Sequence, residues 1–490
     1  MTCTIFTMFD GGGLTYFIID IVLLLTILFG VVIVILENKN PIKTISWILV
    51  IIFLPIIGII LYLYFGRNFR KKKFFNRKEV TDAISFDLLA DNQLIELNQK
   101  KFLKNEKLKS KRHIMKLLIN NNRALVTENN IIKVLNNGKQ TFSSIIFELE
   151  NAKYHINLEY YIIEDDNIGN KIKDILIKKA KEGLIVNVIY DDIGSWSLSR
   201  KFILALRIAG VNIYSFMPVK TYFFANKVNY RNHRKIIVID GKIGFVGGLN
   251  IADRYLREDK SDLWRDTHLK LEGDAVKSLQ SVFLMDWFFV SGNVLNVKKY
   301  FPEHHVEKHH LVQIAASGPD SDWASIMQAF FIAITTARNY VYISTPYFLP
   351  NTSIMTALKT VVMCGVDVKI ILPEKLDSFM IRLSSQSYIE ELLEVGVQIY
   401  YYHKGFTHSK LIIVDDVFSS VGTANMDIRS FDQNFEINAL IYDEEIAVGL
   451  KNDFIDDLKN SYLITYKKFV DKSIFRRFIE SVARIFSPLL

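Results

Sequence analysis

Two motifs in the chain repeat the same chemically useful residues at the same spacing. The first runs from His233 to Asn250 and the second from His408 to Asn425, and both fit H-x-K-x4-D-x6-G-x-x-N. The chain has 10 histidines, so one chance match to the first part of this pattern is improbable, and two with the same downstream residues are far more so. We therefore interpret the motifs as two copies of one functional cluster.

The spacing places the side chains of each motif on one face. Four apolar residues follow each lysine and predict a buried strand, on which residues two apart point the same way. A turn at Asp240 and the following glycine would close a hairpin that places His233 opposite Gly248. The same register would place His408 opposite Thr423. The candidate catalytic residues are His233, Lys235, Asp240, His408, Lys410 and Asp415, and the candidate substrate-binding residues are Gly248, Asn250, Thr423 and Asn425.

Two such clusters facing each other would form a site for phosphoryl transfer. Two imidazoles suit a covalent route, in which one histidine attacks phosphorus and the other moves the proton of the leaving and incoming alcohols. Two lysines and two asparagines would neutralise charge that develops on the phosphoryl oxygens. These side chains do the work of a metal ion, so we expect no metal or other cofactor. At the hairpin turns, a structural role is the expected one for Asp240 and Asp415.

The segment from residue 123 to residue 465 predicts an α/β fold, because short β-rich runs alternate with helical stretches. Residues 154–162 resemble residues 340–348, and in each copy a glycine, Gly183 or Gly365, ends a helix before the next strand. The elements recur in the same order. We expect two pseudo-duplicated domains, at 123–300 and 301–465, with the active site between them.

Two apolar runs near the N-terminus predict a transmembrane hairpin within residues 1–66. They cover about residues 15–36 and 44–65, and each is close to the roughly 20 residues that cross a hydrocarbon core as a helix. Pro55 and Gly58 lie inside the second run, and both are tolerated in membrane helices. Buried core helices are the alternative interpretation.

Basic residues predict the orientation of this membrane region. Seven lysines and arginines lie in residues 67–78, whereas the loop between the apolar runs holds two. The positive-inside rule then places the α/β domains in the cytoplasm, after a basic juxtamembrane connector at 67–122. The net charge of +8 suits an anionic partner, either a lipid surface or nucleic acid. With the apolar runs, it predicts a multi-pass plasma-membrane protein that binds anionic lipids and no nucleic acid; the oligomeric state stays open.

Three other features lie outside the two motifs. Residues 466–490 predict an amphipathic helix in the membrane interface, with docking on the protein's own core as the alternative. His304, His305, His309 and His310 lack regular ligand spacing and are expected in a solvated inter-domain loop. Of the two cysteines, Cys364 lies in an apolar helical pattern, which predicts a buried thiol and no disulfide.

The duplicated H-x-K-x4-D motif resembles that of the phospholipase D superfamily, and the whole chain is similar to bacterial cardiolipin synthases. The similarity includes E-N-K-N-P, F-L-P-I-I-G and G-R-N in the membrane region, L-E-Y-Y-I and D-D-I-G-S in the first domain, W-R-D-T-H-L-K-L-E-G at 264–273, S-G-P-D-S at 317–321, T-P-Y-F-L-P at 345–350 and N-M-D-I-R-S-F-D-Q-N-F-E at 425–436. One departure is that Gly248 and Thr423 stand where the superfamily has serine.

The resemblance implies an activity and further site residues. It implies that His233 is the nucleophile and His408 the acid/base, with Glu436 and Asp266 orienting the histidines. The implied reaction joins two phosphatidylglycerols into cardiolipin and releases glycerol through a phosphohistidine. Lipid hydrolysis, transfer to another alcohol and nuclease activity are the alternatives within the superfamily. A non-enzymatic lipid- or nucleic-acid-binding module is the alternative outside it.

Overall fold

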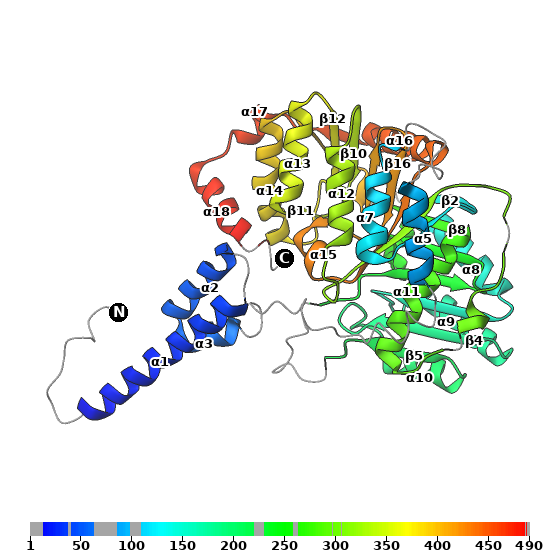
Figure 1. Cartoon of the computed structure of the whole chain (residues 1–490), viewed down its shortest axis with the longest axis horizontal. Coiled ribbons are helices and arrows are strands. Elements are labelled where there is room, and N and C mark those ends of the chain that lie inside the picture. The colour runs from blue at the N-terminus through cyan, green and yellow to red at the C-terminus, as the bar shows by residue number, and fades with distance from the viewer. Residues whose placement is uncertain are drawn as a thin grey trace. The chain divides into compact units, whose positions relative to one another are not determined.

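The computed structural model describes residues 13–37, 41–62, 86–98, 109–219, 230–257, 263–295, 297–304, 306–485 and 487 (Figure 1). The chain divides into two compact units. The N-terminal unit comprises residues 1–72 with 219–229, and the α/β unit comprises residues 73–218 with 230–490. Each unit is described by itself.

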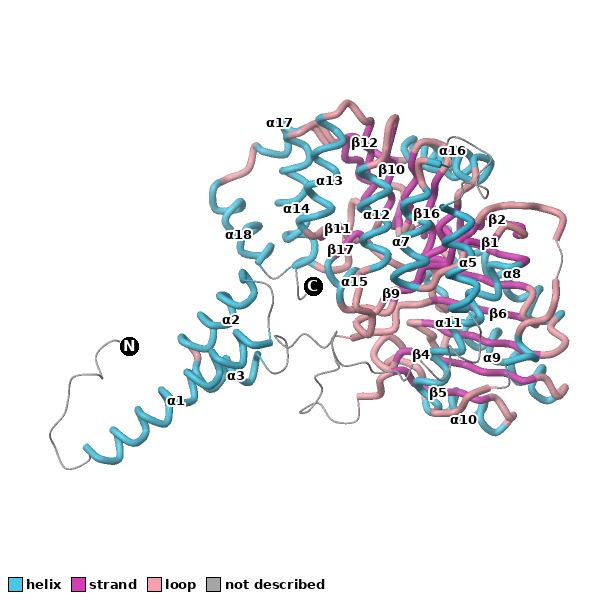
Figure 2. Tube along the Cα trace, in the orientation of Figure 1, coloured by secondary structure: helices cyan, strands magenta, loops and turns pink. Residues whose placement is uncertain are grey.

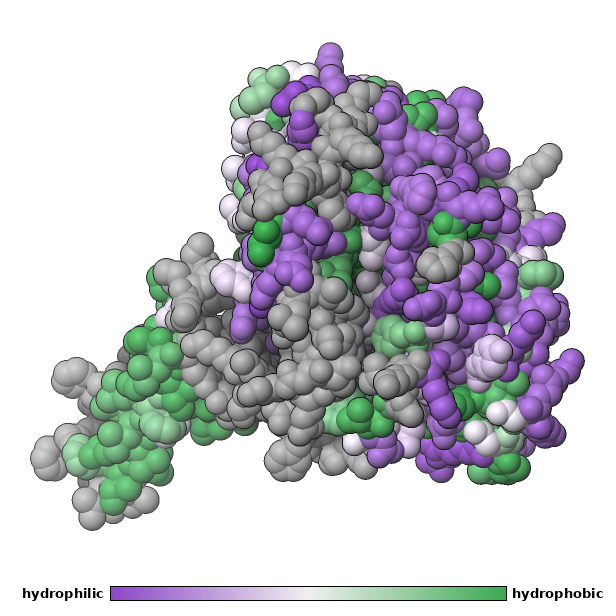
Figure 3. Space-filling view, turned by 45° about the vertical axis from the view of Figure 1, so that its right-hand side comes forward, coloured by the Kyte–Doolittle hydropathy of each residue, from purple (hydrophilic) through white to green (hydrophobic). Residues whose placement is uncertain are grey.

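One helix of the N-terminal unit is long and apolar enough to cross a membrane. Helix α1 (Gly13–Glu37) contains the apolar stretch Phe17–Leu36, most of whose side chains are exposed. Among the residues that the structure describes, it is the one helix that meets this condition. Figure 3 shows green, apolar surface over the N-terminal helices and much purple, hydrophilic surface on the α/β unit.

The second apolar run, predicted as one span over 44–65, is divided into two helices. Helix α2 (Pro41–Phe53) ends before Leu54, and helix α3 (Pro55–Leu61) begins directly after it. Pro55 has no N–H, and its ring disfavours a helical conformation in the residue before it. Leu54 accordingly has φ −134° and ψ 70°, outside the helical region.

The break changes the predicted hairpin of two spans. A Cβ added to Gly58 would come within 2.7 Å of the Val50 carbonyl oxygen, so the glycine lets α3 pack closely against α2. The 13 residues of α2 extend only about 20 Å, which is less than the roughly 30 Å of a hydrocarbon core. The hairpin is therefore present only in part, and residues 63–65 of the predicted span lie outside the described residues.

Two sheets form the core of the α/β unit, one for each copy of the motif (Figure 2). In the first sheet the strand order is β14-β8-β7-β6-β3-β4-β5, and β2 also pairs with β8. Strands β3, β4 and β5 are parallel, and β6 runs antiparallel to β3. The strands are β2 (Asn130–Asn137), β3 (His155–Tyr160), β4 (Ile185–Asp191), β5 (Asn212–Phe216), β6 (Lys235–Ile239), β7 (Ile243–Gly247), β8 (Leu263–Gly273) and β14 (Gly405–Thr407).

The second sheet repeats this arrangement, with the order β1-β9-β18-β16-β15-β10-β12-β13-β19. Strands β10, β12 and β13 are parallel, and β15 runs antiparallel to β10. The strands are β1 (Val126–Thr127), β9 (Val312–Ser317), β10 (Tyr340–Ser344), β12 (Asp367–Pro373), β13 (Gln398–Tyr402), β15 (Leu411–Val414), β16 (Phe418–Gly422), β18 (Glu436–Ile441) and β19 (Ser461–Leu463). A separate ribbon joins β11 (Phe348–Leu349) to β17 (Met426–Asp427).

Helices connect the parallel strands, and the predicted duplication is confirmed. Gly183, at φ 93°, separates a helix from β4, and Gly365, at φ 88°, does the same before β12. Both glycines have the left-handed conformation that ends a helix at low steric cost. The connecting helices are α9 (Asn167–Lys181) and α10 (Arg200–Ile208) in the first half, and α13 (Thr352–Met363) and α14 (Phe379–Glu394) in the second.

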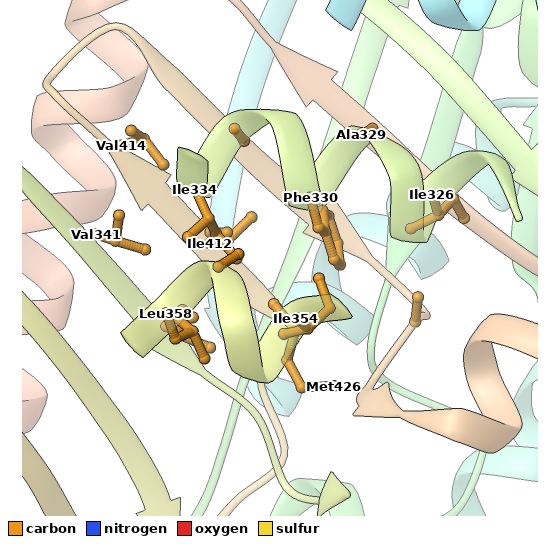
Figure 4. Close-up of a cluster of buried hydrophobic side chains, with 14 of the residues drawn as sticks. Ile326, Ala329, Phe330, Ile334, Val341, Ile354, Leu358, Ile412, Val414 and Met426 are labelled. Carbon is orange, nitrogen blue, oxygen red and sulfur yellow. The ribbon is translucent and has the colours of Figure 1, made fainter. Parts of the chain in front are cut away.

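Helices also bury the outer faces of the sheets. Figure 4 shows Phe330 and Ile334 of α12 (Ser325–Thr335), together with Leu358 of α13, facing Val341 and Ile412 of the second sheet. The first sheet is covered in the same way by α8 (Gly138–Asn151), α9 and α10. Each buried side chain of this size stabilises the fold by about 1.5–3 kcal/mol.

The facing sides of the two sheets share one apolar cluster. Ile236 and Val246 of the first half pack in it with Ile413 and Ile437 of the second. Two helices contribute to the same cluster, α11 (Asp274–Ser291) and α16 (Glu444–Lys459). This shared core fixes the two halves against each other and so allows one site to be built between them.

The predicted connector at 67–122 contains part of the second half's core. Helix α5 (Phe86–Asn98) contributes Leu97 to that core, and helix α7 (Arg112–Asn122) contributes Ile114 and Leu118. Its charged sequence suggested a juxtamembrane connector, and the structure adds that the apolar side of each helix is buried in the α/β unit. The basic run at 67–78 lies outside the described residues.

The register of both motif hairpins differs from the prediction by one residue. Ile239 pairs with Ile243 in the first hairpin, and Val414 pairs with Phe418 in the second, so each turn has three residues. Asp240 and Asp415 adopt left-handed conformations, with φ 53° and 56°. Because aspartate tolerates this conformation, the turn extends by one residue and the expected opposition of each histidine to Gly248 or Thr423 does not form.

Candidate active site

Backbone hydrogen bonds between the two halves position both histidines. The His233 N–H donates to the carbonyl oxygen of Phe435 at 2.9 Å, and the Phe435 N–H donates to that of Arg231 at 2.9 Å. His408 follows β14, which pairs with β8 of the first half, and its N–H donates to the carbonyl oxygen of Arg265 at 2.7 Å. Each histidine is therefore held by the backbone of the opposite half.

The carboxylates that contact the histidines are also exchanged between the halves. Glu436, the first residue of β18, accepts a hydrogen bond from Nδ1 of His233, which lies 2.9 and 3.0 Å from its two oxygens. Asp266 of β8 accepts one from Nδ1 of His408 at 2.8 Å. Both carboxylates are completely buried. A carboxylate at Nδ1 favours the tautomer with the proton there, which leaves the lone pair on Nε2.

The two lysines complete one buried cluster with the histidines. The Lys235 ammonium donates to the carbonyl oxygen of His233 at 2.6 Å, and that of Lys410 donates to the carbonyl oxygen of His408 at 2.7 Å. Burial lowers the pKa of His233 to about 4, and Lys235 and Lys410 contribute to the lowering. Burial lowers the pKa of His408 well below its ordinary value, with further contributions from Lys410, Lys235 and His233. The structure thus brings the four predicted basic residues together.

Burial also shifts the ammonium and carboxyl groups. It lowers the pKa of Lys235 to about 7 and that of Lys410 to about 8. It raises the pKa of Asp266 to about 6. Burial acts to raise the pKa of Glu436, but His233 and Lys235 outweigh it and hold that pKa below the ordinary value. Burial therefore disfavours the charged forms of both lysines and of Asp266, and the negative charge of a bound phosphodiester would favour the ammonium forms of the lysines.

These pKa values predict a bell-shaped dependence of kcat/KM on pH. As the pH rises through about 7 to 8, Lys235 and then Lys410 lose the charge that attracts a phosphate. As the pH falls through about 6, Asp266 is protonated and stops accepting from His408. Initial rates between about pH 5 and pH 9 would show both limbs. In the pH profile of kcat, the alkaline limb should lie at higher pH than in the profile of kcat/KM, because bound phosphate stabilises the ammonium ions. A kcat/KM that stays constant up to pH 9 would contradict this prediction.

The departure from serine at Gly248 and Thr423 matches the lengths of the two carboxylate side chains. The Thr423 hydroxyl donates to Oε2 of Glu436 at 2.5 Å. A Cβ added to Gly248 would come within 2.1 Å of Oδ1 of Asp266. The shorter aspartate therefore occupies the space that a side chain at 248 would fill. Glycine is needed where the partner is Asp266, and a hydroxyl fits where the partner is Glu436.

Gly248→Ala should damage the site more than Thr423→Ala. The added methyl group must displace the Asp266 carboxylate from His408, and we expect kcat to fall roughly 10-fold or more. Thr423→Ala removes one hydrogen bond to Glu436 and should cost less than 10-fold. Turnover measurements on the two variants, with circular dichroism to establish folding, would check the order. Equal losses would show that packing at Gly248 does not position Asp266.

The two asparagines have different surroundings. The Asn250 side chain donates to the Tyr255 hydroxyl at 2.7 Å, and its oxygen accepts from the Ile162 N–H at 3.2 Å. The Asn425 side chain is buried, and its oxygen has no hydrogen-bond partner among the described residues. Both residues lie where the motif predicts, but Asn250 also holds the segment after β3 in place.

Asp240 and Asp415 lie at the opposite ends of their strands from the histidines. Asp240 accepts hydrogen bonds from the backbone N–H groups of residues 153–155 at 2.7–2.9 Å. Asp415 accepts from those of residues 338–340 at 2.8–3.1 Å. They fix the start of the neighbouring strand, so their inclusion among the catalytic residues is corrected to the structural role that the turn position favoured.

Three buried carboxylates around the first motif were not predicted. Asp191 accepts from the Asn232 N–H at 2.9 Å, and Asn232 donates from its side chain to Glu159 at 2.5 Å. Arg234, between His233 and Lys235, pairs with the buried Asp286. Asp191 and Glu159 belong to the D-D-I-G-S and L-E-Y-Y-I segments, but nothing in their spacing to the histidine motif revealed the contact.

Aromatic rings surround both histidines and were also not predicted. The ring of Tyr161 lies 5.0 Å from that of His233 in a T-shaped contact. Trp264 lies 5.4 Å from His408, and Tyr255 packs on Trp264. These rings pack against the imidazoles within the buried site.

The histidine cluster at 304–310 agrees with its prediction in part: the described residues form a loop and His309 is exposed. His310 is buried, and its Nδ1 lies 2.9 Å from an oxygen of Asp443, so it is not solvated. His305 lies outside the described residues. The described residues contain no group of three or more His, Cys, Asp or Glu that could hold a metal ion. Cys364 was predicted to be buried but is exposed, because it follows the last turn of α13.

Comparisons with known proteins agree with the duplicated site. Residues 145–287 and 330–458 match the family described as "Cardiolipin synthase, PLD-like domain". Residues 14–67 match "Phospholipase_D-nuclease N-terminal". The chain is 44% identical over 482 residues to the cardiolipin synthase of Geobacillus sp. (strain WCH70), covering 98% of this chain and 94% of that protein. The chain belongs to the cardiolipin synthase family of the phospholipase D superfamily.

Other relatives support the same family membership. Cardiolipin synthase 2 of Bacillus anthracis is 44% identical over 462 residues, covering 94% of this chain and 89% of that protein. The crystal structure of phosphatidylserine synthase from Haemophilus influenzae Rd KW20 has a TM-score of 0.59 and 16% identity, covering 77% of this chain and 98% of that one. That similarity concerns the fold alone. Membership of the cardiolipin synthase family makes this chain an enzyme of the phosphatidyl transferase type.

Proposed function

We propose that the chain joins two phosphatidylglycerol molecules into cardiolipin and releases glycerol. The observation that carries this proposal is the pair of buried histidines, each held at Nδ1 by a carboxylate of the opposite half and accompanied by a lysine. Two imidazoles suit a double displacement at one phosphorus. The Lys410 ammonium lies 3.0 Å from Nε2 of His408, so a bound phosphate must draw this lysine away before that nitrogen can carry a proton. The cardiolipin synthases that the chain resembles supply the lipid identity.

The first displacement forms a phosphohistidine. Nε2 of His233 attacks the phosphorus of the donor, and the bond from phosphorus to the glycerol oxygen breaks. His408 gives its Nε2 proton to that oxygen, so neutral glycerol leaves. Glu436 stabilises the positive charge that His233 gains, and Lys235 and Lys410 offset the charge on the phosphoryl oxygens.

The low pKa of His408 determines when this residue can act as the acid in this step. In the free enzyme, burial and the neighbouring cations keep His408 neutral. A bound phosphodiester anion would offset those cations and raise this pKa, so the proton that glycerol needs would be taken up with the donor. The acid then exists only when a substrate is present to use it.

The second displacement uses the same groups in reverse. His408 removes the proton from a primary hydroxyl of a second phosphatidylglycerol, and the hydroxyl oxygen attacks phosphorus as the bond to His233 breaks. Cardiolipin is released and both histidines return to their starting states. With water as acceptor, the product would be phosphatidic acid instead, which is the alternative we retain, together with transfer to another alcohol.

We also propose that the enzyme is integral to the plasma membrane, with the α/β unit in the cytoplasm. Helix α1 has the length and composition of a span, and the basic run at 67–78 favours the cytoplasmic side. Because α2 and α3 are separated at Leu54, we propose that they enter the same membrane as a bent pair.

One assay tests the proposed function. Membranes containing the protein would be supplied with EDTA and with phosphatidylglycerol labelled in its terminal glycerol, and released glycerol and lipid products would be measured. Glycerol together with cardiolipin is the expected result. Glycerol with phosphatidic acid would make the enzyme a hydrolase. The absence of released glycerol would exclude phosphatidylglycerol as the donor, and loss of turnover on EDTA addition would indicate a required metal.

A further inference from the structure

The C-terminal helix is docked on the α/β unit through its polar side. Helix α18 (Ile474–Ile485) buries Glu480, which pairs with Lys472 at 2.8 Å and with Arg476 at 3.2 Å. Ser384 of α14 donates to the carbonyl oxygen of Ala483 at 2.7 Å. Docking on the protein, one of the two sequence-based alternatives, is therefore present.

The apolar side of the same helix is exposed. Phe475 is 72% exposed, Phe478 64% and Ile485 74%, and these residues form one stripe with Ile474 and Val482. A helix docked on a water-soluble protein places its apolar stripe inward. The opposite arrangement indicates that the outward side faces an apolar phase rather than water.

A second exposed apolar site lies at the first turn of α14. Phe379 is 72% exposed and Met380 38%. This turn adjoins the C-terminal segment, because one cavity of about 290 Å³ is lined by Leu376 and Arg382 on one side and by Lys472 and Arg476 on the other. The exposed residues of α14 and α18 thus belong to one region of the surface.

This region lies at the edge of the sheet where the histidines are. Strands β10 and β12 are parallel, so their carboxyl ends meet at one edge, and the loop before α14 follows the carboxyl end of β12. That loop contacts the residues after β10, since the Tyr347 hydroxyl donates to Asp377 at 2.7 Å. The motif residue Asn425 directly precedes β17, which pairs with β11 just beyond Tyr347.

The first half has an equivalent feature. Trp196 is 67% exposed and lies in the loop after β4, at the same position in the repeat as the loop after β12. In this loop, Ser195 donates to the carbonyl oxygen of Tyr161 at 3.1 Å, and Tyr161 contacts His233. Both halves therefore place an exposed aromatic residue two positions or fewer from a loop residue that contacts a tyrosine of the repeat, Tyr161 in the first half and Tyr347 in the second.

We propose that these residues form a membrane-docking surface that faces a leaflet containing anionic phospholipid. We define this rim surface as Trp196, Phe379, Met380, Phe475 and Phe478. The arginines of α18 are themselves paired with carboxylates, so the preference for anionic headgroups comes from the net charge of +8. Aromatic side chains favour the depth of the headgroup region. The rim surface would hold the histidines at the height of the lipid phosphates, so that a donor reaches them without leaving the bilayer. The inference rests on the proposed lipid substrate.

Fluorescence labelling tests the surface without using activity. The full chain, with Cys3→Ser and Cys364→Ser, would carry one cysteine at a time, Phe379→Cys or Phe475→Cys, labelled with an environment-sensitive fluorophore. Met363→Cys and Ile208→Cys are matched controls, because these residues are 73% and 78% exposed but are the last residues of α13 and α10, helices that end at the opposite edge of the sheets. In vesicles of phosphatidylglycerol and phosphatidylethanolamine, brominated acyl chains should quench the first pair at least twofold more than the controls. Equal quenching at all four positions would overturn the proposal.

A rate comparison separates this inference from the proposed function. Phe475→Ser/Phe478→Ser should lower the transfer rate about tenfold on bilayer phosphatidylglycerol and leave it unchanged on a short-chain phosphatidylglycerol dispersed as monomers. An equal effect on both substrates would overturn the docking role. If the unmodified protein transfers neither substrate, the proposed function fails, while the quenching result still decides whether the rim surface meets the membrane.

Discussion

Replacing His233 with alanine is expected to lower the transfer rate by roughly 10³-fold or more, because the nucleophile is lost. Replacing His408 should have a similar effect on complete turnover, but by a different route. Without the acid, glycerol leaves slowly, and without the base, the acceptor is poorly activated. His408→Ala should therefore still form some phosphatidyl-enzyme, whereas His233→Ala should form none.

A single-turnover trap distinguishes the two histidines. Each variant would be mixed with phosphatidylglycerol labelled in the phosphate, denatured at alkaline pH, where phosphohistidine survives, and digested to locate the label. We expect the label on residue 233 in the His408→Ala protein. A label on His408 in the His233→Ala protein would reverse the assignment. A label on neither, in variants that remain folded, would argue against a covalent route.

Glu436→Gln is expected to lower kcat by about 100-fold with little change in KM. The amide has the size of the carboxylate, so packing against Thr423 is retained. It lacks the negative charge that stabilises His233 as this residue becomes positive. The rate of phosphohistidine formation, measured by rapid quenching, should fall with kcat, because Glu436 acts on the step in which His233 attacks.

Asp240→Asn provides the matched control for Glu436→Gln. Asp240 belongs to the motif, but its carboxylate binds the backbone at the start of β3, far along the strand from the cluster. The substitution should lower the melting temperature and change kcat only a few-fold. If Asp240→Asn reduced kcat as strongly as Glu436→Gln at temperatures where both are folded, the distinction between a structural and a positioning carboxylate would be wrong.

The duplicated α/β architecture could be predicted because its signals are local. The helix-ending glycines Gly183 and Gly365 and the apolar runs after each lysine fix the elements in order. The exchange of Glu436 and Asp266 could not be predicted in the same way. It depends on how the two halves pack, and no spacing along the chain carries that information.

The sequence-based predictions that differ from the structure do so for physical reasons that can be named. A two-residue turn was the simplest closure for the motif hairpins, but left-handed aspartates at 240 and 415 add a residue to each. Residues 86–122 have a charged composition, which concealed the narrow apolar stripes that α5 and α7 bury. In the second membrane run, hydropathy correctly identified an apolar segment. Hydropathy does not show, however, that Pro55 separates two helices.

The exchange of carboxylates between the halves also constrains how such a protein changes over generations. After a duplication, two copies are usually free to drift apart, because one can lose a function that the other keeps. Here a substitution of Asp266 in the first copy disables His408 in the second, and one of Glu436 disables His233. Selection for either histidine therefore also retains the carboxylate in the other copy. A fragment with a single motif would carry its histidine without the carboxylate that completes it, so it would need a second copy to supply that carboxylate.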